Sequence, residues 1–280
     1  MQNSSALVSP FWLNQHIDDA NLVVFMSTMN VITTGEPEAV PSGYIPGAQL
    51  FDFEHQVCDK TSGLPHTMPS PEVFQQEVRK LGVNNDSVIV IYDNQGVFSA
   101  PRVWWMFKCM GHKHVYVLNG GYPAWQENGF TSDVCLSKAT SLGGFNSNFR
   151  ADLIVDSVQV LAALSTTDKK VIDARSPERF FGKVAEPRAH LRSGHMPNAC
   201  NLPFNQCIDN GQLINNSALR SKFEALAIST KQTLIFSCGS GVTACVLALA
   251  AHEAGYENLS VYDGSWSEWG ADKSLPVVTD

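Results

Sequence analysis

The sequence has no run of basic residues and no apolar run long enough to cross a membrane. Its formal net charge is −8, which argues against binding to nucleic acid or to an anionic membrane surface. Where positive charge does cluster, it therefore indicates a local site. The first residues also lack the patterns of a signal peptide and of an arginine-rich transit segment, and we expect a cytoplasmic protein.

A CxxC motif is also absent, and the seven cysteines are an odd number in a chain of 280 residues. Both features favour a reducing compartment over a disulfide framework. One cysteine stands apart from the others. Cys238 follows a short apolar run, residues 234–236, and precedes an alanine- and leucine-rich stretch of helical length that ends near Gly255. It therefore lies at a predicted turn from strand to helix.

The residues around Cys238 favour a negatively charged sulfur. Gly239 and Gly241 let the loop fold so that the unpaired first N–H groups of the helix point at one atom. Those donors and the helix dipole stabilise a thiolate. The predicted catalytic loop comprises Cys238, Gly239, Ser240, Gly241, Val242 and Thr243, with Ser240 and Thr243 as hydroxyl donors.

The second half of the sequence repeats the first. A strand at 22–26 corresponds to one at 170–174, and residues 88–100 and 115–125 match 233–244 and 259–269. Short apolar strands alternate with helical stretches, which is typical of an α/β fold with a mainly parallel sheet covered on both faces. Two domains of this kind are predicted, at 1–130 and 151–280, with helices such as 71–81 and 218–228 and a polar linker at 131–150.

The two copies differ at the position of the cysteine. The first copy carries Asp93 where the second carries Cys238, so only the second copy has a nucleophile. We expect the first domain to be non-catalytic and to supply walls for a cleft between the domains.

These motifs resemble the tandem rhodanese sulfurtransferases. The resemblance rests on residues 238–243, the two Gly-x-x-Pro-x-Ala turns at 43–48 and 194–199, and residues 99–105 and 263–269. It implies two rhodanese-like domains and a Cys238 persulfide that carries sulfur from a donor to an acceptor, with no metal or organic cofactor. Thiosulfate-using relatives place basic residues after the cysteine, whereas Gly239 and Ser240 are neutral. The resemblance therefore implies 3-mercaptopyruvate as donor, pyruvate as product, and thioredoxin, a small thiol or cyanide as acceptor.

The same resemblance implies roles for residues outside the loop. Arg179 and Arg188 would hold the carboxylate and keto oxygen of the donor, since a guanidinium fork suits a planar carboxylate. Ser240, His66 and Glu54 would form a proton relay in the cleft.

Other interpretations remain open. The donor could be thiosulfate, or the chain could be a non-catalytic sulfur carrier or scaffold. Residues 239–244 also fit a weak dinucleotide-binding pattern, with Asp263 as ribose ligand. Arg179 and Arg188 could simply be ion-pair partners of Glu178 and Glu186. A cysteine phosphatase is disfavoured because Ala244 stands where its loop needs arginine, and the residues at 109–114 are too few for a zinc site.

Overall fold

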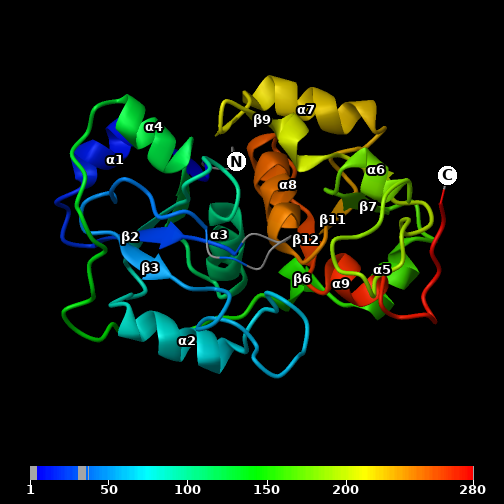
Figure 1. Cartoon of the computed structure of the whole chain (residues 1–280), viewed down its shortest axis with the longest axis horizontal. Helices are drawn as coiled ribbons and strands as arrows, with labels where there is room; N and C mark the ends of the chain where they lie inside the picture. The colour runs from blue at the N-terminus through cyan, green and yellow to red at the C-terminus, as the bar shows by residue number, and fades with distance from the viewer. Residues whose placement is uncertain (1–4, 31–35, 37, 280) are drawn as a thin grey trace.

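The computed structural model describes residues 5–30, 36 and 38–279. They form two α/β halves that lie side by side along the long axis of the molecule (Figure 1). Each half contains a five-stranded, all-parallel sheet, and the strand order of the second sheet repeats that of the first. The strands of the first sheet are, in spatial order, β1 (Leu7–Val8), β5 (Val115–Leu118), β4 (Val88–Tyr92), β2 (Leu22–Ser27) and β3 (Gln49–Phe51). Those of the second sheet are β6 (Ile154–Val155), β12 (Leu259–Tyr262), β11 (Thr233–Ser237), β7 (Lys169–Asp173) and β8 (Cys200–Asn201).

Helices cover both faces of each sheet, because alternate residues of the central strands enter different apolar clusters. In β4, Ile89 and Ile91 join the cluster beneath α2 and α3, whereas Val90 and Tyr92 join the cluster beneath α1 and α4. This confirms the predicted fold class. The helices are α1 (Pro10–His16), α2 (Pro71–Lys80), α3 (Ala100–Cys109), α4 (Gly121–Glu127), α5 (Ser157–Ala163), α6 (Pro177–Phe180), α7 (Asn216–Ala225), α8 (Val242–Glu253) and α9 (Ser265–Trp269).

Two 3₁₀ turns and a hairpin complete the second half: η1 (Ala151–Leu153), η2 (Phe204–Cys207), and β9 (Ile208–Asp209) paired with β10 (Gln212–Leu213). None of the helices formed by the described residues is both long and apolar enough to span a membrane.

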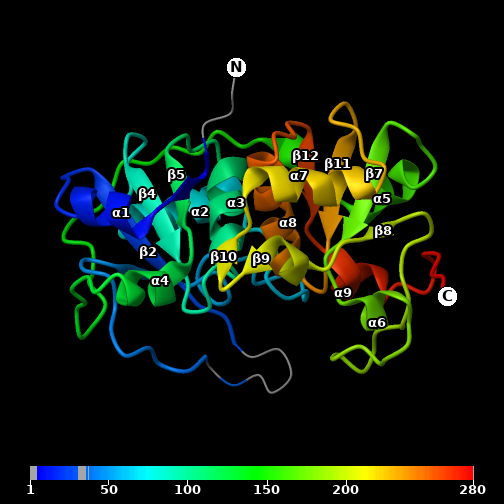
Figure 2. The ribbon, with the colours of Figure 1, turned by 90° about the horizontal axis from the view of Figure 1, so that it is seen from above.

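The two halves share one core. Helices α3 and α8 lie next to each other at the centre of the molecule (Figures 1 and 2). Almost every residue of both helices is buried, and a single apolar cluster contains side chains from both sheets, such as Phe25 and Phe236. A helix that is apolar all round is stable only when it is buried on all sides. The two copies are therefore packed together through a shared core and are not joined by a tether alone.

Two local expectations differ from the structure in detail. The helix expected at 218–228 begins at Asn216, because the Asn215 side chain accepts the N–H of Ala218 as an N-cap. It ends at Ala225, since Ala227 has a positive φ of 56°. The stretch proposed as linker, 131–150, packs along the first half, with Phe145 fully buried against the rings of the core.

Candidate active site

Cys238 lies at the carboxyl end of β11, immediately before α8, where ligand sites of parallel α/β sheets occur. Its side chain is buried, and its N–H donates to Ser265 Oγ at 3.1 Å. The carbonyl oxygens of Cys238 and Gly239 accept the N–H groups of Trp266 and Ser267 at 2.9 and 2.8 Å. The start of α9 therefore fixes the loop from behind, and the sulfur side of the loop is left open.

Glycine is required at position 241. Gly241 has φ 81°, and a Cβ on it would lie 2.9 Å from the carbonyl oxygen of Asp263. A side chain here would both strain the backbone and separate the loop from α9.

The first copy shows what this kind of loop binds. There the carboxylate of Asp93 accepts four backbone N–H groups at 2.8–3.0 Å, from residues 95, 98, 99 and 100. Burial raises the pKa of Asp93, and these four donors oppose that rise. In the second copy, the N–H groups of residues 239–243 have no acceptor within the described part of the chain. The loop is an anion receptor, filled by a carboxylate in one copy and open beside a thiol in the other.

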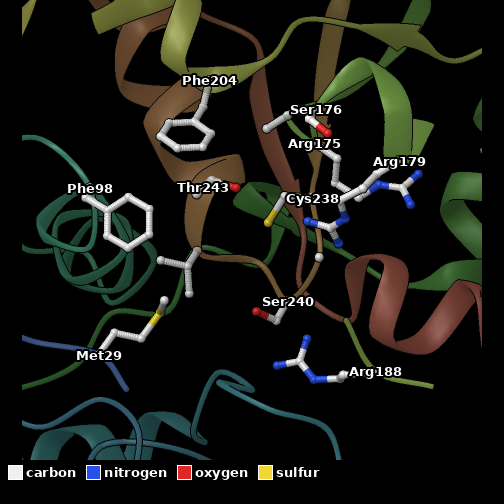
Figure 3. Close-up of a pocket in the computed structure, with 13 residues that line it drawn as sticks. Met29, Phe98, Arg175, Ser176, Arg179, Arg188, Phe204, Cys238, Ser240 and Thr243 are labelled. Atoms are coloured by element: carbon white, nitrogen blue, oxygen red, sulfur yellow. The ribbon is translucent and has the colours of Figure 1, made fainter. Parts of the chain in front are cut away.

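A cavity of about 190 Å³ opens beside the sulfur. Pockets for drug-sized ligands measure roughly 300–1,000 Å³, so this one suits a much smaller molecule. Figure 3 shows Met29 and Phe98 of the first half facing Phe204, Cys238 and Thr243 of the second. The full lining is Met29, Phe98, Ala174, Arg175, Ser176, Arg179, Arg188, Phe204, Cys238, Gly239, Ser240, Val242 and Thr243.

Two of the three arginines in this wall are held by buried carboxylates. Arg175 forms a two-pronged ion pair with Asp173 and also donates to Glu186 at 2.9 Å. Arg179, on α6, donates from Nε and Nη2 to the two oxygens of the same Glu186. Its Nη2 lies 3.3 Å from where a Cβ on Gly239 would be, so a larger residue at 239 would displace this guanidinium.

Arg188 differs from the other two. It is half-buried at the mouth of the cavity and has no hydrogen-bond or ion-pair partner among the residues that the structure describes. Burial and repulsion from Arg179 lower the pKa of Arg188, and the nearby Cys238 and Glu186 oppose this. An unpaired guanidinium that faces a small cavity is suited to bind an anion. Of the two carboxylates considered from the sequence, Glu186 pairs with Arg179, and neither pairs with Arg188 among the described residues.

Ser240, His66 and Glu54 are brought together from the two halves. His66 Nδ1 lies 3.0 Å from Ser240 Oγ, and His66 Nε2 lies 2.9 Å from Glu54 Oε1. Burial would raise the pKa of Glu54, but the His66 ring and the N–H of Asn30 lower it below its ordinary value. An ionised Glu54 can only accept, so His66 Nε2 carries a proton, and in the tautomer with its single proton on Nε2 the Nδ1 atom accepts from the Ser240 hydroxyl. This is the geometry of a base aimed at Ser240.

Both halves match the description "Rhodanese-like domain", over residues 9–128 and 157–272. The chain belongs to the rhodanese family.

Its relatives within that family are sulfurtransferases. The chain is 40% identical over 272 residues to a 3-mercaptopyruvate sulfurtransferase of Escherichia coli K12, covering 95% of each chain. It is 37% identical over 275 residues to a thiosulfate sulfurtransferase of Cricetulus griseus, covering 94% of this chain and 91% of that one. The crystal structure of SseA from Escherichia coli, described as a 3-mercaptopyruvate sulfotransferase, superposes with a TM-score of 0.83 at 36% identity, covering 94% and 99%. These relatives support sulfurtransferase activity for this rhodanese.

Burial encloses three other cysteines of this rhodanese completely, whereas Cys238 lines the cavity. It raises the pKa of Cys207 and Cys245 to about 12 and that of Cys109 well above its ordinary value, so these thiols stay protonated at neutral pH. Cys135 is exposed and lies outside the site. Cys109, Cys207 and Cys245 all pack in the apolar cluster shared by the two halves.

Two alternatives lose their geometric basis. In the dinucleotide-binding alternative, the carboxylate of Asp263 would bind a ribose hydroxyl. That carboxylate already accepts hydrogen bonds from Arg102 at 2.7 Å and from the N–H of Met68 at 2.7 Å. His112, in the stretch considered for zinc, points Nε2 at the carbonyl of Ser87 at 2.8 Å. No cluster of three metal-ligating side chains occurs among the described residues.

Sequence reasoning missed three residues that shape this site. Arg175 and Glu186 organise the arginine wall, and Ser265 holds the N–H of Cys238. The signal for Arg175 was the pattern Asp173-Ala174-Arg175 at the carboxyl end of a buried strand, where ligand-binding side chains gather. Nothing local distinguishes Glu186 from an ordinary surface acid.

Proposed function

We propose that this rhodanese is a 3-mercaptopyruvate sulfurtransferase that carries sulfur on Cys238. The observation that carries the proposal is the arrangement of an open anion-receptor loop around Cys238 and an unpaired Arg188 across a cavity of about 190 Å³. A donor with a carboxylate at one end and a sulfur at the other matches those two features. We assign catalysis to the domain at 151–280 and a supporting role to the domain at 1–130, because Asp93 fills the loop of the first.

The first step breaks one bond and forms one. The Cys238 thiolate attacks the sulfur of 3-mercaptopyruvate, and the carbon–sulfur bond breaks with its electron pair on carbon as the enolate of pyruvate. The proton of the donor thiol ends on that carbon, which gives pyruvate and an ionised persulfide. The loop N–H groups stabilise the charge on the terminal sulfur, as an oxyanion hole does for oxygen.

Arg188 and Arg179 orient the donor through its carboxylate and keto oxygen. A keto oxygen held by a cation accepts the negative charge of the enolate that forms when the carbon–sulfur bond breaks. Ser240, with His66 and Glu54 behind it, can move the proton between sulfur and carbon.

The second half-reaction returns the enzyme to its starting state. An acceptor thiolate, from a small thiol or a protein such as thioredoxin, or cyanide, attacks the outer sulfur of the persulfide and releases the Cys238 thiolate. We propose that the reaction takes place in the cytoplasm, where such acceptors are kept reduced.

Thiosulfate is the second candidate donor, because relatives named for each donor are similarly close to this chain. Gly239 and Ser240 favour 3-mercaptopyruvate, since neither adds positive charge near a sulfonate. A non-catalytic sulfur carrier or scaffold requires neither a donor cavity nor an unpaired arginine.

The test is the intact mass of the protein after mixing with 3-mercaptopyruvate or with thiosulfate, with no acceptor. We expect one added sulfur atom from 3-mercaptopyruvate, removed by a subsequent thiol and absent from Cys238→Ser. Cys135→Ser, which removes an exposed thiol outside the site, is the matched control and should load like the parent. Loading mainly from thiosulfate would overturn the donor, and no loading from either would overturn the enzyme.

A further inference from the structure

Glu186 is a buried charged group of the donor pocket, and it does not line the cavity itself. Its side chain is 1% exposed, and its two oxygens accept hydrogen bonds from Arg175 and Arg179. The negative charge of Glu186 therefore compensates part of the positive charge of Arg175 and Arg179.

We call Arg175, Arg179 and Arg188, together with the carboxylates of Asp173 and Glu186, the arginine wall. Its net charge can be counted from these groups. Arg175, Arg179 and Arg188 contribute three positive charges, and Asp173 and Glu186 contribute two negative ones. No lysine and no carboxylate is among the residues that line the cavity within the described part of the chain. The wall therefore has one net positive charge, located on Arg188.

That net charge equals the charge of only one of the two candidate donors. 3-Mercaptopyruvate with a protonated thiol is a monoanion, whereas thiosulfate is a dianion. Inside a partly buried pocket, where water screens charge weakly, one unit of wall charge changes the binding of a dianion about twice as much as that of a monoanion.

We propose that Glu186 is a specificity-determining residue, which holds the arginine wall beside the Cys238 thiolate at one net positive charge and thereby favours monoanionic over dianionic sulfur donors. The inference rests on the proposed function and names what selects its donor. Glu186 acts through Arg175 and Arg179 and does not touch the donor.

A series of three variants changes the wall charge one unit at a time. Glu186→Gln keeps the shape and raises the net charge to two. Arg179→Gln together with Glu186→Gln removes the whole ion pair and returns the charge to one. Arg179→Gln alone lowers it to zero.

The measured quantity is the ratio of kcat/KM for thiosulfate to kcat/KM for 3-mercaptopyruvate, with one acceptor throughout. Glu186→Gln should raise this ratio by about tenfold, and Arg179→Gln should lower it by a similar factor. The double variant should lie within about threefold of the parent, even where both of its rates fall. Because an unfolded fraction reduces both rates equally, the ratio is insensitive to loss of folded protein.

Two controls separate charge from geometry. Glu178→Gln removes the same charge from an exposed position on α6 and should leave the ratio unchanged. Glu186→Asp keeps the charge with a shorter side chain and should keep the ratio near that of the parent. A purely structural role would make Asp and Gln at 186 equivalent.

Inorganic sulfate gives a binding readout that does not depend on turnover. As a dianion at neutral pH, it should inhibit Glu186→Gln about tenfold more strongly than the parent, with a steeper dependence on salt. An unchanged ratio and unchanged sulfate inhibition in Glu186→Gln would overturn the inference, as would a double variant that behaves like Glu186→Gln. If Glu186→Gln does not fold, the lowered ratio expected for Arg179→Gln decides the question. If the parent protein loaded no sulfur on Cys238 from either donor, the proposed function itself would be refuted, whatever the role of Glu186.

Discussion

The ion pair between Arg102 and Asp263 joins the two halves directly behind the catalytic loop. Arg102, on α3, is fully buried, and its Nη2 donates to Asp263 Oδ1 at 2.7 Å and to the carbonyl oxygen of His66. Its Nε and Nη1 have no partner among the described residues. Burial lowers the pKa of Arg102, but Asp263 more than offsets this and holds the pKa above its ordinary value. Asp263 is thus the countercharge of a buried cation.

Replacing Asp263 with Asn leaves that cation buried without a countercharge. Breaking a buried pair in this way costs about 3–5 kcal/mol, because the remaining ion keeps its desolvation penalty. Replacing Arg102 with Met should cost less, about 1–3 kcal/mol. Asp263 is 13% exposed and keeps its bond from the N–H of Met68, so it retains a partner and some water. The order of the two effects follows from which partner is more deeply buried.

The assay is urea unfolding at neutral pH, followed by tryptophan fluorescence, with the free energy of unfolding compared at equal m-value. Asp152→Asn is the matched control, because Asp152 pairs with Arg150 at the surface, where the side chains are 62% and 54% exposed. Such a pair contributes at most about 1 kcal/mol. If Asp263→Asn lost no more stability than this control, or less than Arg102→Met, the argument from buried charge would be refuted.

Three further predictions follow from the remaining groups. Asp93→Ala leaves four backbone N–H groups, two of them buried and two part-buried, without their acceptor and should lower the free energy of unfolding by about 2–4 kcal/mol in urea titrations, while Cys238 still loads sulfur. The depressed pKa of Glu54 means that its stabilising contribution is present above the pKa of an unfolded glutamate and is lost as pH falls through the folded value. The stability difference between the parent and Glu54→Gln should therefore shrink in acid, and a constant difference would contradict the His66–Glu54 contact. Iodoacetamide with peptide mapping should modify Cys238 and Cys135 before the buried thiols whose pKa is raised. After loading with 3-mercaptopyruvate, the label on Cys238 alone should become removable by a reducing thiol, because it is then attached to the outer sulfur of the persulfide.

The fold was predictable because parallel strands that are buried on both faces appear in the sequence as short apolar runs. The runs at 22–26 and 234–236 became β2 and β11 with one or two residues added. Helix α8 has no polar face, so helical periodicity could not reveal it; its length and the glycines at its ends did. The repeat predicted that the two halves share one fold, and the two sheets have the same strand order.

The site was predictable only where its chemistry is local in sequence. Cys238 and its glycines form one continuous stretch, so propensity and capping rules apply to them directly. The contact of His66 with Ser240 joins residues 174 positions apart and depends on how the two halves pack, which no local pattern specifies. The roles of Arg179 and Arg188 came from the resemblance, and the difference between them came from Glu186, whose pairing required coordinates.

The first half has no cysteine at the loop position and still contributes side chains to the cavity beside Cys238. The carboxylate of Asp93 satisfies the loop of the first half permanently, which frees that half from binding a ligand and stabilises the start of α3. Helix α3 can then serve the other copy, because it carries Arg102 to Asp263 behind the catalytic loop. His66 and Phe98, from the same half, complete the relay and the cavity wall. An isolated second half would keep Cys238 and the arginines but lose the relay, one wall of the cavity and the burial of α8. In the proposed mechanism, catalysis by this rhodanese therefore depends on residues of both copies, because the first half supplies side chains to the cavity beside Cys238.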